Sequence, residues 1–344
     1  MRQGKASHAV MDRCVRRPLQ KMRESMGNTC SALPAGLVSA GSCGGIGEKT
    51  DLSVEMYAAD LMNRLLAEGA DPEELSACLM FPADSPEEPL KELVERLCAF
   101  CTQQGLAIRG VYPQVNAGIL SPQIALTMWG CRQDRIPGPS LDLEAKRSPD
   151  GSGILPADCD LIMIGPAGRA GTAVLAFSFE EELAGRFPLF LVRSAMQMGR
   201  DLSLRKEALA AWELGAVGMQ EIGEGGIFAA LWELGEKFAA GLDVDLKKIP
   251  IRQETIEICE HLDLNPYQLN GTGAMLILAE DGKAMVKALA ENEVSAWVIG
   301  RTTSLKSRII RNGEETRYLE KPQQDMLFQL RSRGQAQREP TEGI

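Results

Sequence analysis

A glycine-rich turn in residues 220–226 (QEIGEGG) offers the clearest arrangement for chemistry in this sequence. It directly precedes residues 227–238, whose apolar spacing predicts an amphipathic helix. The first N–H groups of a helix lack partners within the helix, and Gly225 and Gly226 would let an anion approach them closely. Glu224 in the same turn opposes an anion but could cap the helix or hold a cation. The turn is therefore either an anion site or a plain glycine-rich helix start, and spacing alone favours the latter.

A second glycine-rich stretch, residues 41–50 (GSCGGIGEKT), nearly matches a phosphate-binding P-loop. That motif needs a glycine directly before its Lys-Ser/Thr pair, so that the loop amides and the lysine reach the same phosphates. Here Glu48 precedes Lys49 and puts a negative charge where the phosphates would lie. No clear strand comes before the stretch, and we expect a flexible glycine loop instead of a P-loop.

The cysteines and histidines form no recognisable metal or redox motif. Cys98 and Cys101 fall within a predicted helix, whereas a redox pair sits at a helix N-terminus and a zinc ribbon needs a second matching pair. The two histidines, His8 and His261, are too few for a multi-histidine metal site. His261 lies near a predicted helix C-terminus, where a cation is favourable, so we expect a structural role for it. The residues alone assign no catalytic group and no metal ligand.

Composition and charge limit the class of protein. The 344 residues are 44% hydrophobic and 24% charged, which is typical of a globular chain of about two domains. A net charge of −10 argues against a nucleic-acid-binding protein. Because no apolar run approaches the roughly 20 residues that cross a bilayer, no membrane partner is expected. Nine cysteines without a regular framework favour a cytoplasmic location.

Helix and strand patterns mix in both halves and predict an α+β fold. Apolar residues at helical spacing predict a helix over residues 54–66, and Ser85 followed by Glu88 predicts a capped second helix. Residues 106–112 and 122–130 have strand patterns. In the second half we expect strands at 159–165, 274–279 and 295–300, and helices at 204–214, from 225 onward, at 252–262 and at 281–291.

A proline- and glycine-rich stretch, residues 131–160, has no periodicity and is predicted to link two compact halves. We therefore expect one domain in residues 1–150, a second in residues 151–328 and a polar tail in residues 329–344. The alternation of strands and helices lacks the glycine fingerprint of a doubly wound dinucleotide-binding fold. The prediction is therefore an α+β chain of two domains.

Residues 219–233 (MQEIGEGGIFAALWE) resemble the MHDVTEGGxxxALWE signature of the AIR synthase-related, or PurM-like, superfamily. Residues 165–172 look like the start of the family's C-terminal domain. Segments 242–245, 249–252, 259–260 and 264–267 continue the pattern of its HypE-like members, which are hydrogenase maturation proteins. The resemblance implies an N-terminal sheet domain that pairs into a dimer barrel and a C-terminal α/β sandwich domain. It also implies a homodimer, a nucleotide cleft near the domain junction and a protein partner in a maturation pathway.

The first half resembles the family in layout more than in active-site chemistry. Residues 61–72 look like the family's VNDLLxxGAEP helix, in which Asn63 is retained and the motif aspartate is replaced by Arg64. Residues 108–113 fall where the family has a GGDT or GGHT turn, of which Gly110 remains. The resemblance places six residues in the nucleotide cleft: Asn63, Gly110, Glu221, Glu224, Gly225 and Gly226.

The C-terminal signature departs from the family as well, since Gln220, Glu221 and Gly223 stand where histidine, aspartate and threonine are usual. In this family the acids hold magnesium ions that bridge the phosphates of ATP, and magnesium depends on carboxylate oxygens. Arg64 in place of an aspartate inverts the local charge. We therefore expect weak or altered binding of ATP or another purine nucleotide, and the replaced acids count against magnesium as a cofactor.

Three classes of function stay open. The first is an active ATP-dependent enzyme of the superfamily that performs phosphotransfer or dehydration. The second is a degenerate, non-catalytic member that serves as a dimeric scaffold. The third is a sensor of an anion. The replaced acids favour the degenerate member. HypE acts through a C-terminal cysteine, whereas the last cysteine of this sequence is Cys259, so its thiocarboxamide chemistry is not expected.

Overall fold

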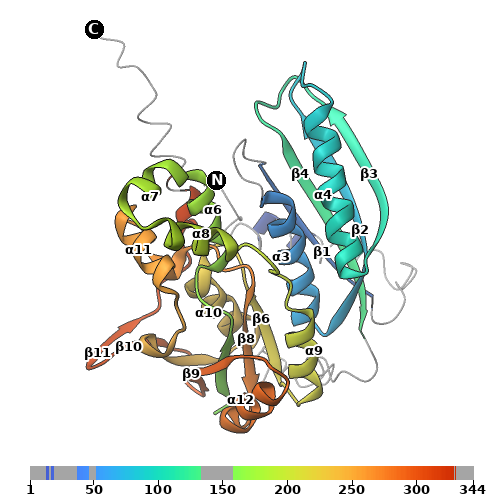
Figure 1. Ribbon diagram of the computed structural model, residues 1–344. Coiled ribbons are helices and arrows are strands. Elements are labelled where there is room, and N and C mark those ends of the chain that lie inside the picture. Colours follow the sequence, from blue (N-terminus) through green and yellow to red (C-terminus); the bar gives the residue numbers. More distant parts are fainter. Residues whose placement is uncertain are drawn as a thin grey trace.

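Two β-sheets organise the chain in a computed structural model (Figure 1). The structure describes residues 13–14, 17–18, 37–45, 52–132, 158–328 and 330. The first sheet has four strands in the order β1-β4-β2-β3, and the second has seven in the order β11-β10-β7-β9-β5-β8-β6. The mixture of helices and strands confirms the predicted α+β fold.

The elements of each half follow one another along the chain. The first half contains β1 (Leu37–Gly45), α3 (Ser53–Ala67), β2 (Ala70–Phe81), α4 (Glu88–Gln104), β3 (Ala107–Val115) and β4 (Gln123–Arg132). The strands of the second half are β5 (Asp160–Ile164), β6 (Gly218–Ile222), β7 (Gly241–Asp245), β8 (Ala274–Ala279), β9 (Ala296–Thr303), β10 (Arg308–Asn312) and β11 (Glu315–Tyr318). Its helices are α6 (Arg169–Ser178), α7 (Glu180–Arg186), α8 (Leu189–Gln197), α9 (Arg205–Glu213), α10 (Gly226–Lys237), η3 (Leu246–Lys248), α11 (Gln253–His261), η4 (Pro266–Gln268) and α12 (Gly282–Glu291).

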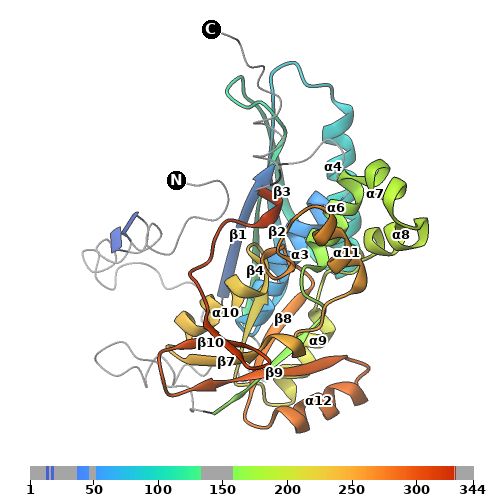
Figure 2. The ribbon, with the colours of Figure 1, turned by 90° about the vertical axis from the view of Figure 1, so that its left-hand side faces the viewer.

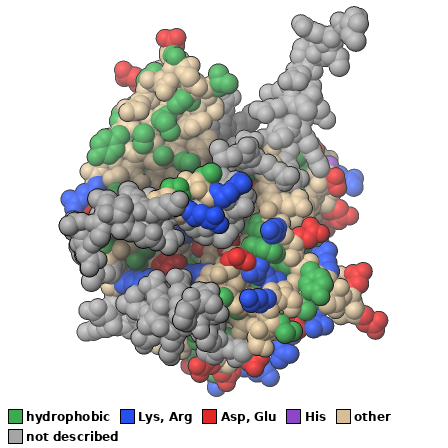
Figure 3. Space-filling view, turned by 180° about the vertical axis from the view of Figure 1, so that it is seen from behind, with side chains coloured by type: hydrophobic (Ala, Val, Ile, Leu, Met, Phe, Trp, Pro, Cys, Tyr) green, Lys and Arg blue, Asp and Glu red, His purple; other side chains and the backbone are tan. Residues whose placement is uncertain are grey.

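Helices α3 and α4 cover one face of the first sheet, and among the described residues no helix covers the other face. In β4, Ile124, Leu126 and Met128 are buried, while the residues between them belong to the opposite face. Such alternation is typical of a sheet that is covered on one side. From behind, the part of the molecule formed by this sheet displays mainly hydrophobic and uncharged side chains (Figure 3).

Helix α3 lies between the two sheets (Figure 2). Its apolar stripe is buried as the spacing predicts, and it contacts β1, β2 and β4 of the first sheet as well as β6 of the second. One hydrophobic core therefore runs from the first sheet through α3 to α9 and to one face of the second sheet.

Buried hydrogen bonds fasten α3 to the second half of the chain. The Asn63 side-chain amide donates to the Leu202 carbonyl at 2.9 Å, and its oxygen accepts from the Leu204 N–H at 2.9 Å. The Trp212 indole N–H donates to the Leu66 carbonyl at 2.8 Å. Each such bond contributes about 1 kcal/mol and fixes the position of α9 along α3.

The second sheet is covered on both faces. Every residue of β8 is buried, which is the pattern expected for a central strand between two layers. In β5, Ile162 and Ile164 pack into the core that contains α3, α9 and α12, while Leu161 and Met163 pack with α10 on the other face. Helices α6, α8 and α11 form a third, smaller cluster.

Two local expectations are wrong. Residues 41–45 form part of the edge strand β1, paired with β4, and not a flexible loop. Backbone pairing needs no side chain, and the Tyr57 ring packs where a Cβ of Gly44 would lie. The capping box also does not form, because the Ser85 hydroxyl donates to the Pro82 carbonyl at 2.9 Å and α4 begins only at Glu88.

Several predictions concern residues outside the described part of the chain. These are most of the 131–160 linker and nearly all of the polar tail. The domain boundary at residue 150 falls there too and stays a prediction. Among the described residues, no helix is long and apolar enough to cross a membrane.

Candidate functional site

The turn before α10 has a backbone that favours glycine. Gly225 and Gly226 have φ angles of +83° and +65°, in the left-handed region. A Cβ at Gly226 would lie 2.6 Å from the carbonyl oxygens of both Tyr267 and Leu269. Gly226 therefore lets the start of α10 pack closely against the chain that follows α11. The positive φ angles and this close packing explain structurally why glycines occupy both positions.

The amide of Gly225 binds a carboxylate of the chain itself. Asp325 Oδ2 accepts from the Gly225 N–H at 2.7 Å, and Oδ1 accepts from the Leu327 N–H at 2.9 Å. Burial raises the pKa of Asp325 to about 7, although hydrogen bonds from backbone amides, including that of Asn270, oppose this shift. The nearby charge of Glu224 adds to it. The N-terminus of α10 thus holds an anion, and that anion is an aspartate from the C-terminal segment.

Arg64 lies among four acidic side chains where α3 meets the second sheet. Its Nη2 is 2.7 Å from Asp60 Oδ2, and its Nε is 3.3 Å from Glu221 Oε1. Burial alone would lower the pKa of Arg64, but the carboxylates of Asp60, Glu221, Glu233 and Glu224 outweigh burial and raise it. The guanidinium is therefore the fixed cation of this acidic cluster.

Gln220 connects two of these acids. Its Nε2 donates to Glu221 Oε2 at 2.8 Å and lies 3.3 Å from Glu233 Oε2. Because the amide can donate two hydrogen bonds, it links the end of β6 to α10. Within the described ranges, no group of three or more His, Cys, Asp and Glu side chains has the arrangement of a metal site.

A small cavity lies between α3 and the turn. It has a volume of about 50 Å³ and is lined by Gly45, Ser53, Met56, Tyr57, Val174, Glu224, Asn270, Asp325, Leu327 and Phe328. These residues come from both halves of the chain and from the segment after β11. The cavity therefore lies at the junction where the sequence predicts a nucleotide cleft.

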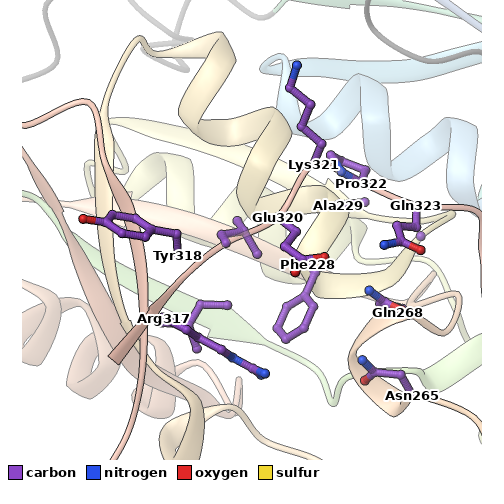
Figure 4. Close-up of a pocket in the computed structure, with 13 residues that line it drawn as sticks. Phe228, Ala229, Asn265, Gln268, Arg317, Tyr318, Glu320, Lys321, Pro322 and Gln323 are labelled. Atoms are coloured by element: carbon purple, nitrogen blue, oxygen red, sulfur yellow. The ribbon is translucent and has the colours of Figure 1, made fainter. Parts of the chain in front are cut away.

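A larger cavity of about 150 Å³ lies beside the turn and is also lined by Gly225. In Figure 4, Arg317 points toward Phe228, Asn265 and Gln268 lie at one side, and Tyr318 points away. The Arg317 guanidinium is 6.0 Å from the centroid of the Phe228 ring. This cavity is formed by the second half alone, so it lacks the contribution from α3 that the predicted cleft requires.

Four of the six residues predicted for the cleft lie together at the end of β6 and in the turn: Glu221, Glu224, Gly225 and Gly226. Asn63 neighbours Arg64 on α3, but its amide is engaged with Leu202 and Leu204. Gly110 lies in β3, paired with Ser76 and next to the Tyr112 ring. The structure does not bring Gly110 to the turn.

Sequence reasoning missed Asp60, Glu233 and Asp325. Asp60 stands four residues before Arg64 on the same helix, a spacing that predicts an ion pair and could have revealed it. Asp325 is 100 residues from its partner Gly225, and no local pattern indicates that contact. Only the folded structure reveals the contact between Asp325 and Gly225.

Comparison with known proteins finds a family model that matches most of the second half. Residues 157–311 match the family model of the AIR synthase related protein, C-terminal domain. The PurL subunit of phosphoribosylformylglycinamidine synthase from Helicobacter hepaticus is 31% identical over 121 residues, which are 33% of this chain and 15% of that protein. This chain therefore matches only a small part of that relative's length.

Solved structures share the fold over most of the chain. HypE in a HypE–HypF complex has a TM-score of 0.67 at 18% identity, covering 91% of this chain and 98% of its own. HypE in complex with ATP has a TM-score of 0.63 at 16% identity, covering 94% and 97%. AaThiL complexed with AMPPCP and TMP has a TM-score of 0.62 at 14% identity, covering 92% and 99%. The predicted PurM-like fold and the resemblance to the AIR synthase-related superfamily are confirmed.

Proposed function

We propose that this AIR synthase-related, PurM-like protein is a degenerate member that binds a purine nucleotide such as ATP without depending on magnesium. The nucleotide would enter the cleft between α3 and the turn of residues 223–226. The observation that carries the proposal is the position of Arg64, which holds Asp60 at 2.7 Å and Glu221 at 3.3 Å. A protein cation thus stands where the family resemblance implies carboxylates that bind a metal.

The charges explain why magnesium should matter little. A divalent cation at this cluster would have to displace the Arg64 guanidinium from Asp60 and Glu221, whose side chains are only 9% and 12% exposed. Breaking a buried pair leaves uncompensated charge and costs several kcal/mol. The cluster therefore favours its own arginine over a metal ion. Nucleotide binding itself is supported by the structural relatives solved with ATP and AMPPCP.

The same arrangement favours a binding or scaffold role over catalysis. Without bound metal ions to bridge phosphates, little remains to stabilise the charge of a phosphoryl or dehydration transition state. A structural relative, HypE, was solved in complex with HypF, which supports a protein partner as part of the proposed role in a maturation pathway. The alternative is an active ATP-dependent enzyme of the superfamily.

Calorimetry with ATP, in the presence and absence of magnesium, tests the proposal. Magnesium is expected to change the dissociation constant by less than about tenfold, or roughly 1.4 kcal/mol. The variant Arg64→Asp restores the family's aspartate and should gain a magnesium requirement. A strong magnesium requirement in the wild type, together with steady ATP hydrolysis that Glu221→Ala abolishes, would establish the enzyme alternative instead.

We also propose that the face of the first sheet opposite α3 and α4 pairs with a second copy of the chain. Ala125 lies in the middle of this face between Cys43 and Cys78 on the neighbouring strands, and the surrounding surface is mainly uncharged (Figure 3). A face of this kind is typical of a protein interface. The family's dimer barrel agrees with this arrangement.

Light scattering tests the dimer. The wild type should have twice the chain mass of 37.4 kDa at tens of micromolar protein, and Ala125→Arg should shift it to the monomer. Glu92→Arg places the same charge on the exposed side of α4 and should leave the dimer intact. A monomeric wild type would refute this part of the proposal.

A further inference from the structure

The segment after β11 crosses the junction beside α10 and is anchored at both ends. At its start, Leu319 is buried and its N–H donates to the Arg308 carbonyl at 2.8 Å. At its far end, Met326 is buried in the cluster of α6, α8 and α11. Figure 2 shows this part of the chain, in dark red, rising from the seven-stranded sheet past α10. We refer to residues 319–328 as the strap.

Asp325 is the residue by which the strap enters the cleft. Its side chain is 1% exposed and accepts from the Gly225 N–H at 2.7 Å and from the Leu327 N–H at 2.9 Å. The backbone amide of Asn270 also hydrogen-bonds to it. Two of these three donors, Gly225 and Asn270, belong to the body of the protein. They would stay in place if the strap moved.

Burial and a neighbouring acid oppose the charge of this carboxylate. The groups that hold it are backbone amides, and the like charge of Glu224 acts on it and raises its pKa. The other residues with side chains that line the cavity come from α3, α6, the loop before β8 and the strap, and they are Ser53, Met56, Tyr57, Val174, Asn270, Leu327 and Phe328. Tyr57 is the titratable group among them. Burying a charged carboxylate is costly even when amides hold it, and the neighbouring acid adds to that cost.

We propose that Asp325 is an internal ligand, whose carboxylate occupies the amides of Gly225 and Asn270 that bind a phosphate group of the nucleotide. The strap is therefore autoinhibitory, because the nucleotide can bind there only after the strap leaves the cleft. This inference rests on the proposed nucleotide-binding function. The raised pKa of Asp325 agrees with it, since burial disfavours the carboxylate in the docked state.

The geometry makes the competition direct. The cavity that remains beside Asp325 has a volume of only about 50 Å³, and the strap residues Leu327 and Phe328 line it. Displacement of the strap would enlarge this space and release the amides in one movement. When a binding-competent state is populated only in part, the apparent dissociation constant rises by the inverse of that fraction.

The test uses calorimetry to compare ATP binding by three versions of the 344-residue chain. Asp325→Ala removes the internal ligand and should bind ATP at least tenfold more tightly than the wild type. Asp281→Ala is the matched control, because Asp281 caps α12 by accepting from the Ala284 N–H at 2.9 Å and is exposed. This control should leave ATP affinity unchanged.

Hydrogen exchange of the strap gives a second readout that does not need a variant. In the wild type, ATP should accelerate exchange of the Leu327 amide, which is bonded to Asp325 in the docked strap. If Asp325→Ala does not fold, this measurement decides the question. Unchanged or slower exchange with bound ATP would overturn the inference.

The outcomes separate this inference from the proposed function. If the wild type binds ATP as tightly as Asp325→Ala or more tightly, Asp325 is part of the site wall and the internal-ligand inference is wrong, while nucleotide binding stands. If both proteins are folded and neither binds ATP, the proposed function fails and the inference fails with it.

Discussion

Removing the charge of Arg64 should destabilise the fold at neutral pH. Arg64→Met keeps an unbranched side chain with good helix propensity but leaves Asp60 and Glu221 without their cation. The side chains of Arg64, Asp60 and Glu221 are 26%, 9% and 12% exposed. Breaking a buried ion pair costs about 3–5 kcal/mol, and since Arg64 is about one quarter exposed we expect the lower end, about 3 kcal/mol.

Urea denaturation measures the free energy of unfolding, and thermal melting should show a fall of roughly 6–12 °C at about 2–4 °C per kcal/mol. Arg109→Met is the matched control, because Arg109 pairs with Glu74 at 2.8 Å on the same half but is 68% exposed. An exposed pair of this kind contributes about 0–1 kcal/mol. The loss in Arg64→Met should therefore clearly exceed the loss in the control.

The pH dependence of Arg64→Met supplies the refuting result. Without the arginine, burial should raise the folded-state pKa of the neighbouring carboxyls. The protonated carboxyls then contribute to the free energy of unfolding at low pH, and this contribution is lost as the pH rises through the raised pKa. The variant should therefore recover stability toward the wild type between pH 7 and pH 5. If its stability at pH 7 lies within about 1 kcal/mol of the wild type, Arg64 is not the counterion of this cluster.

Further predictions concern the turn, the strap and α9. Gly226→Ala should destabilise by well over the about 1 kcal/mol expected of Gly105→Ala, because Gly105 has a similar φ of +67° but open space around it, and thermal melting compares them. Burial raises the pKa of Asp325 from 3.8 to about 7. Its contribution to the free energy of unfolding is therefore greatest below about pH 4 and is lost as the pH rises to about 7. Urea denaturation of the wild type at pH 5 and pH 8 should show the part of this loss that falls between pH 5 and pH 7, with about 3 kcal/mol as the upper bound, and Asp325→Asn should remove it. Trp212→Phe removes the hydrogen bond to the Leu66 carbonyl and should cost about 1–3 kcal/mol in denaturation experiments, whereas an unchanged midpoint would contradict the fastening role of α9.

The regular elements follow from local patterns in the sequence. The stripe of α3, the apolar run of β8 and the helix after Gly226 are predicted by the spacing of residues that lie near one another in the chain. Elements without such a pattern escape prediction. Strand β1 ends in a cysteine and two glycines, and the first five residues of β2 include Asp71, Pro72 and two glutamates. Both segments are nevertheless strands because β4 pairs with them.

The features of the candidate site also fall into those that the sequence predicts and those that it does not. The sequence by itself determined the turn before α10, the family resemblance and the replacement of an acid by Arg64, because each is a property of neighbouring residues. Only the tertiary structure decided that Arg64 pairs with Glu221 and that Asp325 accepts a hydrogen bond from the Gly225 amide, 100 residues away. Contacts between distant charges depend on how α3 packs on the second sheet and where the strap runs, and a buried charge is tolerated only where folding brings it a partner.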